Sequence, residues 1–218
     1  TNFWREQILD LTLYHYWRSS SSWRVRWALA IKGQQSKFVH VDLLSGETEQ
    51  EPHLSRNPLG YVPVLNVDGQ NLIESVAIIE WLEENFPTPS LYPGDTFKRA
   101  QIRTLAEIIN ANTQPVQNLN VVDRLPENQR TEWKEYFICR GLEAYQKIAS
   151  RSAGIFSVGD SVSAADLFLI PQYYNALRNK INLSQFQLVE KIYQAALQTK
   201  PCQAAHPDQF NPPSAAAT

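Results

Sequence analysis

The sequence predicts an α+β protein in which a mixed β-sheet domain is followed by an all-helical domain. Three observations predict this fold class. Strand and helix patterns follow one another in the order β-α-β-α-β-β-α, a stretch rich in proline interrupts them at 86–95, and no strand pattern follows it. We therefore expect a sheet domain at 8–87, an all-helical domain at 95–205 and a flexible tail at 206–218.

The elements of the first domain follow from the spacing of apolar residues. Alternation of apolar and polar residues indicates strands, and the helical spacing in 22–32 ends at Gly33, a common helix stop. Asp68-Gly69 is a tight-turn dipeptide between two strand patterns. The expected elements are a strand at 8–14, a helix at 22–32, a strand at 38–43, a polar helix-compatible stretch at 47–56, strands at 62–67 and 71–73, and a helix at 75–85.

The second half carries only helical patterns. They run through 98–119, 128–150, 164–178 and 188–199. Ser163 and Asp166 are three residues apart before an apolar run, which predicts a capping box. We interpret this motif as structural, because capping alone explains it.

Composition excludes several classes of function. The 218 residues are 43% hydrophobic and carry a net charge of only −2, which favours a packed core and disfavours a nucleic-acid or anionic-membrane partner. Cys139 and Cys202 are too few for a disulfide framework or a thiolate metal site, and the four histidines lack ligand spacing. No apolar run is long enough to span a bilayer. We expect no metal and a cytoplasmic protein.

Four consecutive serines, at 19–22, lie where the first strand ends and the first helix begins. The first-turn N–H groups of a helix are unpaired and its dipole is positive there, so an anion such as a thiolate is favoured. Lowering a thiol pKa of about 8.5 requires about 1.4 kcal/mol for each unit, which hydroxyl hydrogen bonds and the dipole could supply. Taken alone, the segment is equally compatible with a serine-rich helix cap that binds nothing.

A second group of residues favours a peptide-like ligand. Val62-Pro63 stands inside a strand pattern, where proline is expected only at a sheet edge or with a cis bond. An edge backbone would be open to pairing with a peptide. Glu74-Ser75 opens a helix and forms a second N-terminal anion site. A thiol site, a peptide-pairing edge and a carboxylate site together fit glutathione, although each has an ordinary structural explanation by itself.

The chain resembles the zeta class of cytosolic glutathione transferases, which includes maleylacetoacetate isomerase, over nearly its whole length. The class pattern Ser-Ser-Cys-x-Trp-Arg-Val-Arg stands at 19–26, with Ser21 in place of the cysteine. Other similar segments are Asn57-Pro58, Val62-Pro63, 74–80, 114–119 and 158–160. The resemblance implies the cytosolic glutathione transferase fold, with a thioredoxin-like first domain and a helical second domain, and a homodimer with glutathione as cofactor.

The resemblance also implies roles for individual residues. Ser19 would activate glutathione, with Ser20 and Ser21 beside it as further catalytic residues. The implied glutathione-binding residues are Ser19, Ser20, Ser21, Ser22, Trp23, Arg24, Val62, Pro63, Glu74, Ser75, Gln114, Asn118, Leu119 and Asn120. Arg178 and Arg18 would bind a substrate carboxylate, which the guanidinium fork suits. Besides Ser21, the chain departs from the family at Gly60-Tyr61 and Thr48, which affects local contacts.

The implied activity is cis–trans isomerisation of maleylacetoacetate-like acids in tyrosine and phenylalanine breakdown, glutathione conjugation of small α-halo acids, or both. In this family the glutathione thiolate is the nucleophile and the protein supplies no covalent residue. The alternative is a non-catalytic protein of the same fold that binds ligands or acts as a scaffold. The serine cluster and Arg178 favour the enzyme, whereas the missing motif cysteine at Ser21 mildly favours the alternative.

Overall fold

The structure is a computed structural model that describes residues 9–212. The described residues form two compact units. Unit 1 comprises 9–86 together with 207–212, and unit 2 comprises 87–206. The residues at 1–8 and 213–218, which include much of the expected tail, lie outside the described part.

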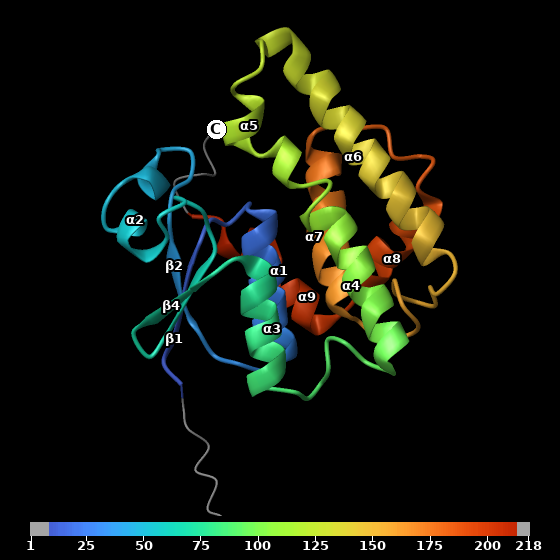
Figure 1. Ribbon diagram of the computed structural model, residues 1–218, viewed down its shortest axis with the longest axis horizontal. Helices are drawn as coiled ribbons and strands as arrows, with labels where there is room; N and C mark the ends of the chain where they lie inside the picture. The colour runs from blue at the N-terminus through green and yellow to red at the C-terminus, as the bar shows by residue number, and fades with distance from the viewer. Residues whose placement is uncertain (1–8, 213–218) are drawn as a thin grey trace, which may run out of the picture. The chain divides into compact units, whose positions relative to one another are not determined.

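Unit 1 is a four-stranded mixed sheet with helices packed against it (Figure 1). Its elements are β1 (Leu11–His15), α1 (Ser20–Ile31), β2 (Lys37–His40), η1 (Glu47–Glu49), α2 (His53–Arg56), β3 (Val64–Val67), β4 (Gln70–Ile73) and α3 (Ser75–Asn85). The strand order is β2-β1-β3-β4, with β1 parallel to β2 and the other neighbours antiparallel. The predicted α+β class and the predicted order of strands and helices are therefore confirmed for this unit.

The core of unit 1 lies between the sheet and the pair α1 and α3, which pack side by side (Figure 1). The alternation in β1 buries Leu11 and Leu13, as expected for a strand with one covered face. Helix α1 is buried over most of its length, and Trp23 and Trp27 are almost completely inaccessible. Because α1 is enclosed, its charged side chains must find partners inside the unit.

The expectation for Val62-Pro63 is wrong in one respect. The paired register of β3 begins at Val64, and β3 lies between β1 and β4 rather than at the sheet edge. Val62 and Pro63 thus precede the strand, where proline removes no ladder hydrogen bond, and the bond between them is cis. The position of β3 depends on strands distant in sequence, so the local pattern could not reveal it.

Unit 2 is helical, as predicted. Its elements are α4 (Thr96–Asn110), η2 (Pro115–Gln117), α5 (Leu119–Val122), α6 (Glu127–Ala149), α7 (Ala164–Arg178), α8 (Gln187–Leu197) and α9 (Lys200–Ala205). The described residues of this unit contain one isolated bridge, Ala153 to Gly159, and no strand. The predicted helix at 98–119 is too long, because the chain turns after Asn110 to form η2 with Pro115 at its start.

Close packing in unit 2 depends on Gly141 in α6. A Cβ at this position would lie 2.0 Å from Thr113 Oγ1, so the glycine allows α6 to approach the turn after α4. Thr113 is buried and donates its hydroxyl hydrogen to Ile108 O over 2.7 Å. Thr113 therefore fixes the turn that leads into η2 through its contact with α6 and its hydrogen bond to α4.

The first residues of the expected flexible tail take part in the fold. His206 ends unit 2, and residues Pro207–Phe210 form the short helix η3 in unit 1. Phe210 packs edge-on against His15 and Phe38, with ring centroids 5.3 and 4.9 Å apart. This aromatic contact holds a segment whose composition alone suggested a loose end.

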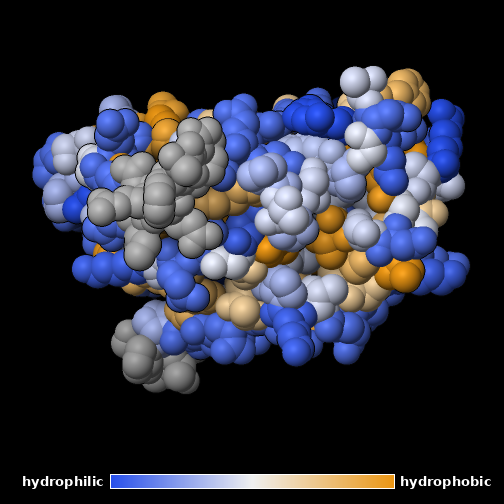
Figure 2. Space-filling view, turned by 90° about the horizontal axis from the view of Figure 1, so that it is seen from below, coloured by the Kyte–Doolittle hydropathy of each residue, from blue (hydrophilic) through white to orange (hydrophobic). Residues whose placement is uncertain are grey.

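The surface agrees with the predicted packed core. Hydrophilic residues cover most of the face seen in Figure 2, and hydrophobic residues show between them in small groups. Among the described residues, no helix combines the length and apolar character that crossing a bilayer would require.

Candidate functional site

Ser19 is the N-cap of α1, one residue before the start of the helix. Its Oγ accepts a hydrogen bond from Ser22 N over 3.1 Å, and its own backbone N–H donates to Tyr16 O over 3.1 Å. Among the described residues, the hydroxyl hydrogen of Ser19 has no acceptor. The cap therefore holds Ser19 by its oxygen and leaves the O–H able to donate to an anion.

The other serines of the cluster differ in accessibility. Ser20 and Ser21 are half-buried in the first turn of α1, whereas Ser22 is fully buried. The Oγ of Ser22 has no hydrogen-bond partner among the described residues. The side chains of Trp23 and Arg24 are also inaccessible, so these three positions could reach a ligand only through the backbone. The accessible hydroxyls of the cluster are therefore those of Ser19, Ser20 and Ser21.

The start of α3 lies beside α1 within unit 1 and forms the second predicted anion site. Glu74 is its N-cap, is exposed, and has a strained backbone with φ 67° and ψ 117°. Such a conformation in a residue other than glycine typically persists where the surrounding structure requires it, often at binding sites. Ser75 is buried, and its Oγ accepts a hydrogen bond from Arg24 Nη1 over 3.2 Å.

The segment before Val62 is fixed by two side chains. Tyr61 O accepts from Asn57 Nδ2 and lies within hydrogen-bond distance of His53 Nε2, at 3.0 Å in both cases. Gly60 has φ +66°, and a Cβ there would lie 3.1 Å from Thr48 O. The departure from the family at Gly60-Tyr61 thus builds a tight turn against Thr48, and Asn57 acts as a structural residue.

Sequence reasoning missed a buried basic cluster next to the serines. Arg26 is 1% exposed and donates to Trp17 O over 3.0 Å, to His15 Nδ1 over 3.0 Å and weakly to Tyr16 O. Because a guanidinium only donates, His15 Nδ1 is the acceptor and the ring is neutral. Burial, the Arg26 charge and His40 lower the pKa of His15 to about 3. Burial lowers the pKa of Arg26 to about 9.

The remaining predicted glutathione ligands belong to unit 2. Gln114 and Asn118 are half-buried around η2, and Leu119 and Asn120 are exposed in α5. Between them, the buried Gln117 faces α7 instead. Its Nε2 donates to Gln172 Oε1 over 2.7 Å, and its Oε1 accepts from Asn175 Nδ2 over 2.8 Å. Gln117 therefore joins the segment at 114–120 to α7.

The two arginines predicted to bind a carboxylate are both exposed. Arg178 lies in the last turn of α7, one turn after Asn175. Arg18 lies in unit 1 directly before Ser19, and its guanidinium carbon is 4.1 Å from the centre of the Trp17 ring. Both cations are therefore accessible to solutes.

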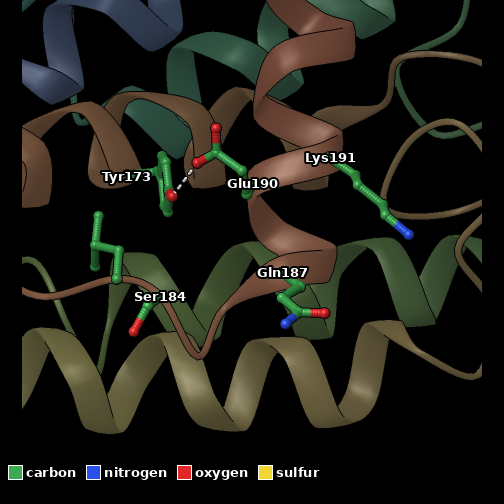
Figure 3. Close-up of a pocket in the computed structure, with 6 residues that line it drawn as sticks. Tyr173, Ser184, Gln187, Glu190 and Lys191 are labelled. Atoms are coloured by element: carbon green, nitrogen blue, oxygen red, sulfur yellow. Dashed lines mark hydrogen bonds between the residues drawn. The ribbon is translucent and has the colours of Figure 1, made fainter.

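Other candidate sites carry no comparable chemistry. No group of acidic, cysteine or histidine residues in the described part of the chain could hold a metal ion. Burial raises the pKa of the Cys202 thiol to about 12, and burial with Glu135 and Glu143 raises that of Cys139. A hollow of about 490 Å³ lies beside Tyr173 and Glu190. Figure 3 shows these two side chains hydrogen-bonded to each other, with Lys191 pointing away.

Comparison with known proteins gives concordant results. Residues 9–84 match the family model of the glutathione S-transferase N-terminal domain. The chain is 42% identical to probable maleylacetoacetate isomerase 1 of Drosophila melanogaster over 198 residues, covering 89% of this chain and 80% of the relative. It is 40% identical to the zeta-class glutathione S-transferase of Euphorbia esula over 205 residues, covering 91% of each.

A solved structure is similar over nearly the whole chain. The maleylacetoacetate isomerase of Anaeromyxobacter dehalogenans 2CP-1, with GSH bound in its active site, has a TM-score of 0.86 and 45% sequence identity. The match covers 96% of this chain and 99% of that protein.

Proposed function

The chain belongs to the zeta-class glutathione S-transferase family, and we propose that it is an enzyme that isomerises maleylacetoacetate-like acids from cis to trans with glutathione as cofactor. The observation that carries the proposal is the N-terminus of α1. Three accessible hydroxyls, on Ser19, Ser20 and Ser21, stand there at the positive end of a helix. The first turn holds no acidic side chain, so the positive end is available to an anion.

Glutathione, when bound, would supply a thiolate nucleophile for the cis double bond of the substrate. The protein has to lower the pKa of that thiol and hold it still. Ser19 suits this task because its oxygen is fixed by Ser22 N while its O–H can donate. Each unit of pKa depression requires about 1.4 kcal/mol, within reach of one or two such bonds and the helix dipole.

The start of α3 suits the γ-glutamyl end of the tripeptide. Ser75 and its first-turn N–H group offer donors to a carboxylate, and the exposed Glu74 offers an acceptor to an ammonium group. Val62 stands outside the paired sheet register, where its peptide groups suit the cysteinyl backbone. Together these positions would hold both ends of the cofactor around the serine cluster.

We also propose roles for two exposed arginines and for four residues of unit 2, as the family resemblance implies. Arg178 or Arg18 would hold a substrate carboxylate through a bidentate pair. Gln114, Asn118, Leu119 and Asn120 would complete the contacts to glutathione. The same activated thiolate would also displace halide from small α-halo acids, which gives a second transferase activity at the same serines.

Two further features extend the proposal. We propose a homodimer, because exposed apolar side chains such as Leu59 and Phe97 offer surface for a second copy. We also propose a cytoplasmic location, which suits the free thiols of Cys139 and Cys202. Light scattering tests the first statement by the mass of the protein in solution.

Turnover of maleylacetone with and without glutathione tests the function. The enzyme gives the trans product only when glutathione is present, and calorimetry detects glutathione binding. A non-catalytic protein of the same fold binds glutathione but gives no rate above buffer. That second result would establish the scaffold alternative.

A further inference from the structure

Helix α1 carries two arginines, Arg24 and Arg26, that are as inaccessible as its core residues. Arg24 is 0% and Arg26 is 1% exposed. Neither side chain can touch a small molecule bound at the surface of unit 1. Burying a guanidinium is unfavourable unless it is hydrogen-bonded, so the bonds that each arginine makes explain why it is there.

Arg26 binds the chain that leads into Ser19. Its Nη2 donates to Trp17 O over 3.0 Å, and its Nη1 approaches His15 Nδ1 at 3.0 Å and Tyr16 O at 3.5 Å. Tyr16 O also accepts the backbone N–H of Ser19. One planar guanidinium therefore contacts three consecutive residues, from the last residue of β1 to Trp17.

The C-terminal segment of unit 1 covers this contact. The guanidinium carbon of Arg26 lies 4.6 Å from the centre of the Phe210 ring, and the same ring packs against His15. The aromatic face excludes water from the hydrogen bonds and adds a cation–π attraction. The short helix η3 is thus part of the support for Ser19.

Arg24 reaches the other end of the site. Its Nη1 donates to Ser75 Oγ over 3.2 Å, at the first residue of α3. Ser75 directly follows Glu74, whose backbone is strained with φ 67°. Because Arg24 extends from α1, its bond ties the start of α3 to the helix that begins at Ser19.

We infer that Arg24 and Arg26 are positioning residues that hold the two glutathione-binding helix N-termini, Arg26 acting on the thiol end through the loop before Ser19 and Arg24 on the γ-glutamyl end through Ser75. The inference rests on the proposed function and deepens it. Neither guanidinium is accessible to glutathione or substrate. Arginine suits both positions because its rigid fork contacts several acceptors at once at Arg26 and holds a donor in a fixed direction at Arg24.

The test uses Arg26→Lys and Arg24→Lys, which keep the positive charge but lose the fork. We expect Arg26→Lys to raise the pKa of bound glutathione, read from thiolate absorbance, and to lower kcat about ten- to a hundredfold with little change in KM. We expect Arg24→Lys to raise KM for glutathione about tenfold with a smaller change in kcat. This separation between kcat and KM is the result that a merely structural role would not produce.

Lys32→Met is the matched control. Lys32 is also buried on α1, and it pairs with Glu83 of α3 at 2.5 Å, at the opposite ends of the same two helices. Losing this pair should lower the melting temperature but leave the thiol pKa, kcat and KM unchanged. If Lys32→Met gave the same kinetic changes as the arginine variants, general loosening of the helix pair would replace the positioning role.

Amide hydrogen exchange without glutathione tests the inference apart from the proposed function. Arg26→Lys should speed exchange at Ser20–Ser22, and Arg24→Lys should speed exchange at the start of α3, each without affecting the other. Equal exchange in variant and parent would overturn the positioning role even in an active enzyme. Failure of the parent protein to bind glutathione would overturn the proposed function while these exchange patterns still decide the positioning role.

Discussion

Helices α7 and α1 both begin after a serine N-cap, Ser163 and Ser19 respectively. Only α7 of these two helices has an acidic residue in its first turn. At α7, Asp166 Oδ2 accepts from Ser163 N over 2.8 Å, and Oδ1 accepts from Ser157 N over 2.9 Å. All three residues are completely buried. At α1, solvent can reach the hydroxyls of Ser20 and Ser21 in the first turn, and the third hydroxyl, on Ser22, is buried.

This difference separates a structural helix start from a binding one. In α7 the protein's own carboxylate meets the positive end of the helix, so the site is complete and has nothing to offer a ligand. In α1 the corresponding position is Ser22, which brings no charge. The charge that would complement α1 has to come from outside, which is what a glutathione thiolate supplies in the proposed function.

Among the variants that test this difference, Ser19→Ala should have the largest effect on activity. Removing a donor from a developing or bound anion typically lowers the rate about 10²–10³-fold, and we expect that loss in kcat/KM for maleylacetone. Loss of the N-cap should also lower the free energy of unfolding by about 1 kcal/mol, measured with urea.

Ser36→Ala is the matched control for Ser19→Ala. Ser36 also lies in unit 1, outside the serine cluster, and its hydroxyl donates to Leu11 O. This variant should change stability slightly and the rate not at all. A Ser19→Ala enzyme with parental kcat/KM would show that α1 is only capped, as α7 is.

At α7, the corresponding change acts on stability alone. Asp166→Ala leaves the N–H groups of Ser157 and Ser163 buried without an acceptor, so we expect the free energy of unfolding to fall by about 3 kcal/mol. Asp160→Ala is the control, because Asp160 is exposed and accepts Ile155 N from the same loop. It should cost about 1 kcal/mol or less. A loss of kcat in folded Asp166→Ala would contradict the purely structural assignment.

The contrast between the two helix starts could be predicted from the sequence only in part. The spacing of Ser163 and Asp166 predicts the capping box, and the serine run predicts a helix start with free donors. The burial of Arg24 and Arg26 could not be predicted, because charged residues on a helix normally face solvent. Their partners, Ser75 and the Trp17 carbonyl, become neighbours only when α1 packs on α3 and the sheet.

The end of one helix and the place of Val62-Pro63 in the sheet also differ from what the sequence predicts. The helix predicted at 98–119 stops at Asn110, and the turn that follows leads into η2 at Pro115, where Gln117 is bonded to Gln172 in α7, a partner 55 residues away. Of the two alternatives for Val62-Pro63, a sheet edge or a cis bond, the structure has the cis bond, and the position of β3 inside the sheet is set by strands distant in sequence. Local patterns predicted the type of most elements, and distant contacts decided where they end and what they touch.

The two regions should also differ in their response to acid. Burial, with Arg26 and His40, lowers the pKa of His15 near α1 to about 3, so the folded state binds fewer protons than the unfolded chain between that value and about 6.5. Stability from His15 is therefore complete above pH 6.5 and is lost as pH falls, by about 1.4 kcal/mol for each unit. Hydrogen exchange of β1 and α1 amides between pH 7 and 5, corrected for the intrinsic rate, measures this loss as about 2 kcal/mol.

The contribution of Asp166 to stability depends on pH in the opposite direction. Burial raises its pKa, so its contribution is largest at low pH and falls as pH rises through the interval between the unfolded and folded values.

His15→Gln is the control for the α1 region, since its amide oxygen can still accept from Arg26. This variant should flatten the acid-induced loss in unit 1 and leave unit 2 unchanged; an unaltered slope would assign the loss to another group.

The smallest expected effect comes from making α1 resemble α7. Ser21→Asp places a carboxylate in the accessible first turn of α1, where it complements the helix dipole and should stabilise the fold by about 0.5 kcal/mol. The same charge repels a thiolate, so the pKa of bound glutathione should rise by about one unit and kcat/KM should fall about tenfold at neutral pH. Ser21→Asn, which is similar in size but uncharged, should keep most of the activity, and thermal melting with thiolate absorbance measures both effects. Opposite signs for stability and rate are the decisive result, because a helix start that served only as a cap would gain stability and have no activity to lose.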